Sequence, residues 1–260
     1  MKIGICGGTG LIGRNLAKDL LYGGDEVIIF SRSGKTPDSL KNFSNLKIIQ
    51  TSMPESNALE GLDAIINLAG EPIVSGKWTS THKKKIWTSR VDFTKNLVFN
   101  FQKLKKKPSI FISGSAIGYY GMYDKDDHSL TESSGQGKDY LAELCSEWEK
   151  EANVAEQLGI RTIIARIGIV LSKEGGALQQ MLPAFKSFVG GPLGKGKQAM
   201  SWIHIQDIIN ALIYLMKNKD TSGVYNLTAP NPVNNESFSN TLGNVLSRPS
   251  FLKAPSFAIS

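Results

Sequence analysis

The sequence predicts an α/β fold built on a doubly wound parallel sheet, followed by a small C-terminal cap. Two features predict it: a glycine-rich turn joins a strand to a helix within residues 2–22, and apolar strand segments then alternate with helical ones. Strands that are apolar at nearly every position, such as 64–68, are expected when helices cover both faces of a parallel sheet. We therefore place the sheet domain at residues 1–170. Residues 171–260 are expected to form mostly the cap, and the cap segments alternate along the chain with the last strands of the sheet.

The spacing of apolar residues places the individual elements. Ile3 and Ile5 alternate as in a buried strand, and Leu16 and Leu20 recur on one face of a helix that stops at Gly23. Further strands are predicted at 26–30, 46–50, 64–68, 109–113, 161–166 and 223–227. Further helices are predicted at 208–216 and along one long crossover that carries the lysines of 83–85 and 103–107.

The turn after the first strand has the spacing of a dinucleotide-binding loop. Gly7 permits a turn that a side chain blocks, Gly10 lets the backbone approach a pyrophosphate, and Gly13 lets the helix lie close to the strand. The dipole and unpaired N–H groups of the helix N-terminus favour phosphate. The predicted cofactor contacts are Gly7, Thr9, Gly10, Leu11, Ile12 and Gly13. A purely structural glycine turn is the alternative.

The end of the second strand favours NADP(H) over NAD(H). An NAD-binding protein usually places a carboxylate there for the ribose 2′-hydroxyl, whereas this chain has Ser31, Arg32 and Ser33. A guanidinium can pair with a 2′-phosphate in bidentate fashion, and the two hydroxyls can add hydrogen bonds. The alternative is that Arg32 is a solvated loop arginine.

The composition is that of an ordinary globular protein: 260 residues, of which 41% are hydrophobic and 20% charged. No apolar run approaches the ~20 residues of a membrane span, so we expect no membrane partner. Because the chain enters its first strand at once, we expect no leader segment. Cys6 in a core strand and Cys145 in a helix suit a reducing compartment, and we expect a cytoplasmic protein.

A net charge of +7 raises the hypothesis of nucleic-acid binding. The lysines gather at 83–85 and 103–107, where a solvated helix face explains them, and no aromatic residues interleave with them as stacking platforms. We therefore expect neither a nucleic-acid partner nor a metal. The basic charge suits an anionic ligand such as NADP(H).

Several separate segments together resemble one known family. They are residues 67–73, 89–91, 113–121, 148–149, 191–194, 201–204 and 228–233. In this order they closely resemble an atypical branch of the extended short-chain dehydrogenase/reductases, labelled the epimerase family. The resemblance implies a Rossmann-like fold, a nicotinamide cofactor and a substrate-side cap. Relatives continue beyond 248–249, so we expect a C-terminal piece of the cap to be missing.

Ordinary members of that family use a serine, a tyrosine and a lysine four residues after the tyrosine. Ser115 matches the serine and Tyr140 the tyrosine, which makes them candidate catalytic residues, but Leu144 stands at the lysine position. Positions four apart share a helix face, so an uncharged side chain lies where the cation belongs. An unperturbed phenol, with a pKa of about 10, is almost wholly protonated at neutral pH. The alternative is a packed tyrosine and a serine that caps a strand end.

The resemblance also implies further contacts. On the cofactor side they are Leu68, Ala69, Gly70, Arg90, Ser113, Arg166, Ile167 and Gly168, and on the substrate side Tyr120, Trp202 and His204. Arg90 replaces the helix asparagine of ordinary members and brings a charge near the site. Arg166 has a structural ion pair as its alternative, and His204 a structural place beside a helix N-terminus. Met200 and Ser201 replace an arginine–aspartate pair that holds sugar nucleotides, so no nucleotide-sugar substrate is assigned.

These features together indicate an NADP(H)-dependent oxidoreductase or epimerase-like enzyme acting on a small carbonyl or hydroxyl compound. The leucine at the lysine position motivates an alternative, a catalytically weak NADP(H)-binding sensor or scaffold. The sequence leaves a homodimer open.

Overall fold

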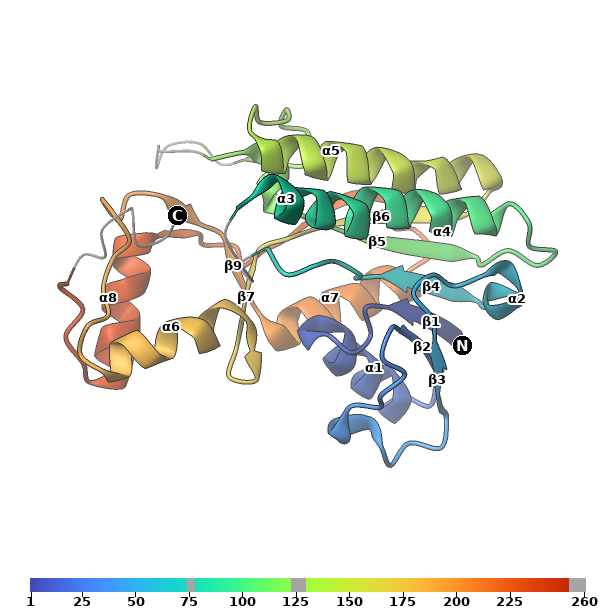
Figure 1. Ribbon diagram of the computed structural model, residues 1–260, viewed down its shortest axis with the longest axis horizontal. Coiled ribbons are helices and arrows are strands. Elements are labelled where there is room, and N and C mark those ends of the chain that lie inside the picture. The colour runs from blue at the N-terminus through green and yellow to red at the C-terminus, as the bar shows by residue number, and fades with distance from the viewer. Residues whose placement is uncertain (74–77, 123–129, 253–260) are drawn as a thin grey trace.

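A computed structural model describes residues 1–73, 78–122 and 130–252 of the chain. Its centre is a seven-stranded sheet in the order β10-β6-β5-β4-β1-β2-β3, and each neighbouring pair is parallel. The strands are β1 (Lys2–Cys6), β2 (Glu26–Ser31), β3 (Leu46–Gln50), β4 (Ala64–Asn67), β5 (Ile110–Ala116), β6 (Arg161–Ile167) and β10 (Gly223–Leu227). From β1 the chain builds outward to β3 on one side and to β10 on the other, so the predicted doubly wound sheet is confirmed (Figure 1).

Helices cover both faces of this sheet (Figure 1). One face carries α1 (Leu11–Tyr22) and α7 (Ile205–Lys217), and the other carries α3 (Ser80–Trp87), α4 (Phe93–Phe101) and α5 (Tyr140–Asn153). Shorter helical segments are α2 (Ser56–Leu59) and the 3₁₀ turns Asp38–Leu40, Ile117–Tyr120 and Val154–Leu158. The central strands are therefore buried on both faces, which explains their apolar sequences.

Each face of the sheet has its own apolar core. Ile5 of β1 shares one cluster with Leu16 of α1 and Leu212 of α7, whereas Phe111 of β5 and Phe101 of α4 belong to the other. The rings of Phe101 and Phe111 meet edge to face with centroids 5.2 Å apart. All five side chains are fully buried, so both helical layers are held mainly by the hydrophobic effect.

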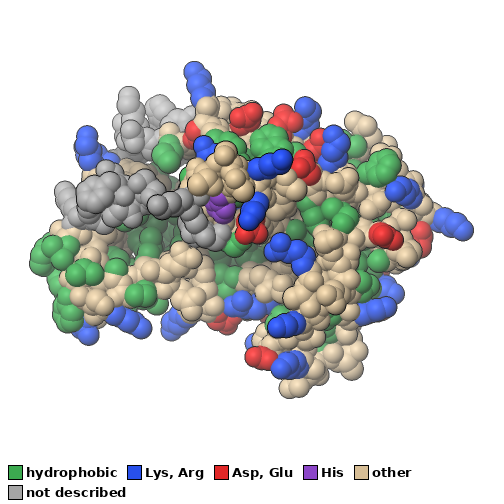
Figure 2. All heavy atoms as spheres, in the orientation of Figure 1, with side chains coloured by type: hydrophobic (Ala, Val, Ile, Leu, Met, Phe, Trp, Pro, Cys, Tyr) green, Lys and Arg blue, Asp and Glu red, His purple; other side chains and the backbone are tan. Residues whose placement is uncertain are grey.

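The crossover between β4 and β5 differs from the single long helix that the sequence predicts. The helix ends at Phe101, and the lysines of 103–107 lie beyond it. The backbone N–H groups of Lys105 and Lys106 donate to the Glu60 carboxylate at 3.1 and 2.7 Å instead of to helix carbonyls. These lysines thus belong to a turn that Glu60 holds. Figure 2 shows basic side chains spread over the visible face, with acidic ones between them.

The remaining elements, which we call the cap, lie to one side of the sheet (Figure 1). Its elements are β7 (Ile169–Ser172), α6 (Gly176–Lys186), β8 (Ala199–Met200), β9 (Trp202–His204), β11 (Val233–Asn234) and α8 (Asn235–Leu246). β7 pairs in parallel with β9, and β8 pairs antiparallel with β11. The sequence did not predict these short strands, because pairs of two or three residues carry no recognisable periodicity.

Among the described residues, no helix combines the length and apolarity needed to cross a membrane.

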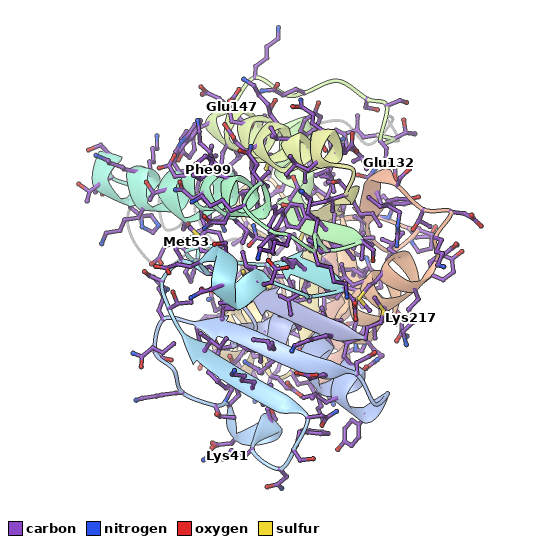
Figure 3. All side chains as sticks on the ribbon, turned by 90° about the vertical axis from the view of Figure 1, so that its right-hand side faces the viewer. Lys41, Met53, Phe99, Glu132, Glu147 and Lys217 are labelled. Atoms are coloured by element: carbon purple, nitrogen blue, oxygen red, sulfur yellow. The ribbon has the colours of Figure 1, made fainter. Side chains whose placement is uncertain are left out.

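Phe101→Ala is expected to lower the free energy of unfolding by about 3–5 kcal/mol, because it opens a cavity beside Phe111. Phe99, which Figure 3 labels on the same helix, is 52% exposed and provides the matched control. Phe99→Ala is expected to change stability by about 0.5 kcal/mol or less. Urea unfolding followed by circular dichroism measures both variants. Equal losses would contradict the placement of the core beneath α4.

Candidate functional site

Close backbone contacts shape the glycine loop between β1 and α1. Gly7 has a left-handed backbone with a φ of 76°, and a Cβ there would lie 2.5 Å from the carbonyl oxygen of Leu68. A Cβ on Gly13 would collide with the carbonyl oxygen of Gly7. The N–H of Gly10 donates to the same carbonyl at 3.0 Å and closes the turn. The loop therefore needs glycine at 7 and 13, and it brings the first N–H groups of α1 to a cleft.

That cleft has a volume of about 300 Å³ and lies between the glycine loop and the cap. It is lined by Gly7, Gly10, Leu11, Ile12, Gly13, Leu68, Ile169, Val170, Gly176 and Ala177. The turn between β7 and α6 contacts α1, because the side chain of Arg14 on that helix donates to the carbonyl oxygen of Glu174 at 3.0 Å. The cap thus forms one wall of the predicted cofactor site.

Several polar groups lie at the end of β2, the strand that pairs with β1. The hydroxyls of Ser31 and Ser33 lie 3.3 Å apart, and the side chain of Arg32 is 79% exposed. Its guanidinium lies 3.9 Å from the carboxylate of Glu71, in the loop after β4. A pair this exposed contributes little to stability, so Arg32 is free to exchange Glu71 for a stronger anion.

A π-helical turn at Thr88–Asp92, between α3 and α4, holds the loop after β4. Ser89 accepts a hydrogen bond from the N–H of Glu71, and Arg90 donates to the carbonyl oxygen of the same residue, both at 2.9 Å. A Cβ on Gly70 would lie 2.8 Å from the guanidinium carbon of Arg90, so glycine makes room for that group. Burial lowers the pKa of Arg90 from its ordinary value.

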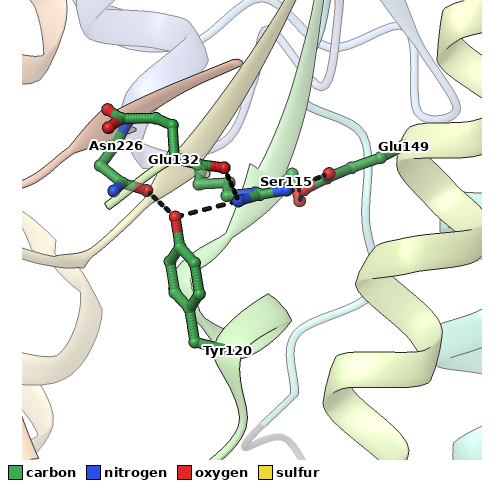
Figure 4. A network of polar contacts seen from close by, with 6 residues as sticks. Ser115, Tyr120, Glu132, Glu149 and Asn226 are labelled. Carbon is green, nitrogen blue, oxygen red and sulfur yellow. Dashed lines mark hydrogen bonds and ion pairs between the residues drawn. The ribbon is translucent and has the colours of Figure 1, made fainter. Parts of the chain in front are cut away.

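Ser115, Glu149 and Arg166 form a buried polar chain between the sheet and α5; Figure 4 labels Ser115 and Glu149. Ser115 and Arg166 are paired neighbours on β5 and β6, so their side chains share a face of the sheet, and Glu149 of α5 contacts both. The Ser115 hydroxyl donates to Glu149 Oε1 at 2.6 Å, and Arg166 donates to both carboxylate oxygens at 2.8 Å. All three residues are buried away from water, with 3–6% of their surface exposed.

Aromatic neighbours complete the surroundings of Arg166. Its Nη1 donates to the hydroxyl of Tyr120 at 2.9 Å, which donates in turn to Asn226 at 2.6 Å (Figure 4). Its guanidinium carbon lies 3.4 Å from the ring centroid of Tyr119. Burial alone lowers the pKa of Arg166, but hydrogen bonds to Glu149 and Tyr120 raise it above its ordinary value. The side chain therefore adopts the structural ion pair that the sequence offered as its alternative.

The sequence analysis did not identify Glu149 as the partner of Ser115 and Arg166. A signal was available, because Glu149 lies between Cys145 and Ala152 on the otherwise apolar buried face of α5. A carboxylate on such a face is rarely buried unless it is paired. Its partners could not be named, since the register of β5 against β6 is a tertiary property.

The predicted catalytic residues Ser115 and Tyr140 point to different partners. The Tyr140 hydroxyl donates to the carbonyl oxygen of Lys83 on α3 at 2.8 Å, and its ring packs edge to face with Trp78. Burial raises the pKa of this phenol, although the charge of Arg90 acts in the opposite direction. The phenol thus stays protonated at neutral pH, and its proton is already donated.

The remaining lysine position of the relay is apolar in space as well as in sequence. Leu144 is 1% exposed and belongs to a cluster with Ile86, Val91 and Trp148. On α5, the side chains that face Ser115 are those of Cys145 and Glu149. The relay of ordinary family members is therefore replaced here by a thiol and a carboxylate on the helix face that meets the serine.

The thiol of Cys145 is also missing from the predicted site. Burial, and then the charge of Glu149, raise its pKa to about 11, while hydrogen bonds with the Ala116 backbone and the Ser115 side chain oppose the shift. The thiol is therefore neutral at physiological pH and a poor nucleophile.

Other predicted residues are distributed around the edge of the sheet. Ser113 is fully buried, with its hydroxyl donating to the carbonyl oxygen of Gly114, so its side chain does not reach the cleft. Gly168 follows Ile167 and packs against the backbone of Ser201. The N–H of Ala69 donates to the side chain of Asn67 at 3.2 Å, in the loop next to the cleft.

The predicted substrate contacts are not all brought together. His204 is the N-cap of α7, where its Nδ1 accepts from the N–H of Gln206 at 3.2 Å, as the structural alternative expected. Trp202 lies on β9, paired with Ile169. Tyr120 instead lines a separate cavity of about 490 Å³. The other side chains that line this cavity are those of Trp78, Met122, Lys138, Asp139, Tyr140 and Leu141.

The chain matches the sequence model of the NAD dependent epimerase/dehydratase family over residues 3–228. It belongs to that family. The predicted resemblance is therefore confirmed. One curated relative is the chloroplastic epimerase family protein SDR39U1 homolog of Arabidopsis thaliana, 40% identical over 264 residues, which span 100% of this chain and 75% of the relative. Another is epimerase family protein YfhF of Bacillus subtilis (strain 168), 37% identical over 100% of this chain and 84% of the relative.

Two solved structures share the architecture of this chain. Human epimerase family protein SDR39U1 (isoform 2), crystallised with NADPH, is 30% identical with a TM-score of 0.86, covering 99% of this chain and 84% of that one. UDP-glucuronic acid 4-epimerase from Bacillus cereus has a TM-score of 0.85 at 20% identity, over 98% of this chain and 86% of that one. The second likeness shows a shared fold alone.

Glu149→Gln is expected to lower the free energy of unfolding by about 3–5 kcal/mol, because it leaves the buried guanidinium of Arg166 without an anion. Glu147 on the same helix pairs with Lys150 at 3.4 Å in an exposed position, and Glu147→Gln is the matched control. The control is expected to change stability by about 0.5 kcal/mol or less. Urea denaturation measures the free energy of unfolding of both variants. A mild effect of Glu149→Gln contradicts the buried ion pair.

Alkylation should report the raised pKa of Cys145. At pH 8 we expect iodoacetamide to label it roughly 100-fold more slowly than an unperturbed thiol, with a tenfold rise per pH unit up to about 11. Peptide mass spectrometry follows Cys145 separately from Cys6, and urea-unfolded protein is the control. Because the thiol pKa is higher in the folded state, this group also reduces stability as pH rises from about 9 to about 11. Rapid labelling at pH 8 contradicts the assigned burial.

Proposed function

We propose that the protein is an NADP(H)-dependent oxidoreductase, or an epimerase-like relative of one, that acts on a small carbonyl or hydroxyl compound. One observation carries the cofactor choice: the largely exposed guanidinium of Arg32 stands at the end of β2, beside the hydroxyls of Ser31 and Ser33. Since β2 pairs in register with β1, this group lies next to the glycine loop. The NADPH crystallised with human SDR39U1 supports the same choice.

The cleft suits a dinucleotide because the loop that lines it carries glycines, which have no side chain to block the approach of a ligand to the backbone. A Cβ at Gly7 would collide with the carbonyl oxygen of Leu68, and one at Gly13 with that of Gly7, so glycine at both positions lets the strand, the loop and α1 converge. In this proposal the first N–H groups of α1 bind the diphosphate, and Arg32 releases Glu71 to bind the 2′-phosphate. Leu68 and the cap wall of the cleft exclude water. When bound, the nicotinamide supplies the hydride chemistry.

A second candidate is a protein that binds NADP(H) with little or no turnover, as a sensor or scaffold. Specific contacts favour it: the Ser115 hydroxyl is donated to Glu149, and the Tyr140 hydroxyl to Lys83. Neither group then offers a proton to a substrate without breaking a hydrogen bond. A reducing compartment such as the cytoplasm suits either candidate, because Cys6 and Cys145 are free thiols.

Single-turnover measurements separate the two candidates. Protein saturated with NADPH is mixed with a panel of aldehydes and ketones, and the loss of NADPH absorbance is followed. Stereospecific hydride transfer supports the oxidoreductase, whereas tight NADPH binding without oxidation supports the sensor. Failure of the folded protein to bind either nicotinamide cofactor overturns both.

Arg32→Ala is expected to weaken NADPH binding about 10- to 100-fold, because a charge-assisted contact to phosphate is lost. NADH binding should stay within about twofold, since NADH lacks that phosphate. Lys47 on the neighbouring β3 is exposed, and Lys47→Ala controls for a general loss of positive charge. Titration of NADPH and NADH fluorescence gives the dissociation constants. Equal losses for both cofactors contradict the role assigned to Arg32.

A further inference from the structure

Among the described residues, the half-buried guanidinium of Arg90 forms no salt bridge, although the carboxylate of Glu71, which pairs with Arg32, interacts with it electrostatically. Its Nη1 donates to the carbonyl oxygens of Glu71 and Ile86, at 2.9 and 3.5 Å, and to the hydroxyl of Ser89 at 3.4 Å. Within the described residues, its Nε and Nη2 make no hydrogen bond. The contrast is Arg166, whose charge is fully met by Glu149.

The surroundings make this arrangement costly without a ligand. Arg90 lies over the ring of Trp148, at 5.5 Å from its centroid, beside the apolar cluster that contains Leu144 and Val91. Burial lowers its pKa, which reports that water solvates the charge poorly. Charged groups in such places are normally paired or bind a ligand.

The backbone around Arg90 is arranged to keep the guanidinium in place. A five-residue π-helical turn carries it, and π turns are rare and frequent at functional sites. Gly70 leaves the space that the guanidinium occupies. The loop of Gly70 follows the carboxyl end of β4, the edge at which open α/β sheets bind ligands.

We propose that Arg90 binds an anionic group of the substrate, a carboxylate or a phosphate, through its unused Nε and Nη2. An Nε–Nη2 edge matches the two oxygens of such a group. Arg90 does not itself line the 490 Å³ cavity, but Tyr140, which interacts with it electrostatically, and Leu141, which packs against the apolar cluster beside it, both do, and that cavity offers space for the rest of the molecule. The substrate is then an anionic carbonyl or hydroxy compound with an apolar body. This inference rests on the proposed function and narrows its substrate class.

Benzoate and its neutral analogue benzamide provide a matched pair of probes for the NADPH-loaded protein. Benzoate is expected to raise the melting temperature in a saturable way, and benzamide to leave it unchanged, because only the carboxylate pairs with Arg90. Arg90→Gln should weaken benzoate binding about tenfold or more, and Arg90→Lys should weaken it less. Inorganic phosphate, tested alone, decides whether the subsite prefers a carboxylate or a phosphate.

Ser89→Ala is the control for loop position. It removes the other bond to the Glu71 backbone but keeps the guanidinium, so the benzoate response should survive. The proposal is overturned if benzoate and phosphate both leave the wild-type protein unchanged, or if Arg90→Gln binds benzoate as well as wild type does. It is also overturned if Arg90→Gln loses NADPH affinity about tenfold, since the anion is then the cofactor's diphosphate. Absence of NADPH binding to wild type overturns the proposed function instead, and the benzoate series on the unloaded protein still tests Arg90.

Discussion

The rest of the site depends on one steric constraint, the contact between the glycine loop and the loop after β4. Gly7 turns directly against the backbone of Leu68, and Gly13 brings α1 against Gly7. No side chain fits at either contact, so the helix start and the β4 loop enclose a cleft between adjacent strands β1 and β4. The chain changes direction across the sheet at this point, which is where doubly wound folds bind ligands.

The two arginines of the site show how burial separates structure from function. Arg166 is closed off by a carboxylate, two tyrosine rings and the sheet, and this network joins β5, β6 and α5 into one unit. Arg90 is held by backbone carbonyls, the hydroxyl of Ser89 and an aromatic ring, and it forms no salt bridge among the described residues. A buried charge paired with its anion is a structural element, whereas a half-buried guanidinium with unused N–H groups keeps donors that can bind an anion. The same logic explains why Arg32, exposed and loosely paired, suits an exchangeable phosphate.

The structure shows which groups surround Ser115 and Tyr140 in place of the lysine that ordinary family members carry four residues after the tyrosine. The face of α5 that meets Ser115 carries a neutral thiol and a carboxylate committed to Arg166, and Tyr140 is turned toward α3. The positive charges near Tyr140 come from Arg90, on the neighbouring helical segment, and from Lys83, whose Nζ lies 5.2 Å from the centroid of the Tyr140 ring. The family fold is thus retained while the polar groups of its usual relay are redistributed.

The sequence by itself determined the parallel sheet, the glycine turn and the basic end of β2, because these follow from local periodicity and from short motifs whose geometry is fixed by neighbouring residues. It could not determine that Glu149 joins Ser115 to Arg166, that a π turn carries Arg90, or that His204 caps a helix. Those outcomes depend on strand register, on helix rotation and on which buried charges find partners. Each is fixed only when segments distant in the chain pack together, since polar groups leaving water must then be satisfied by whatever the tertiary fold places beside them.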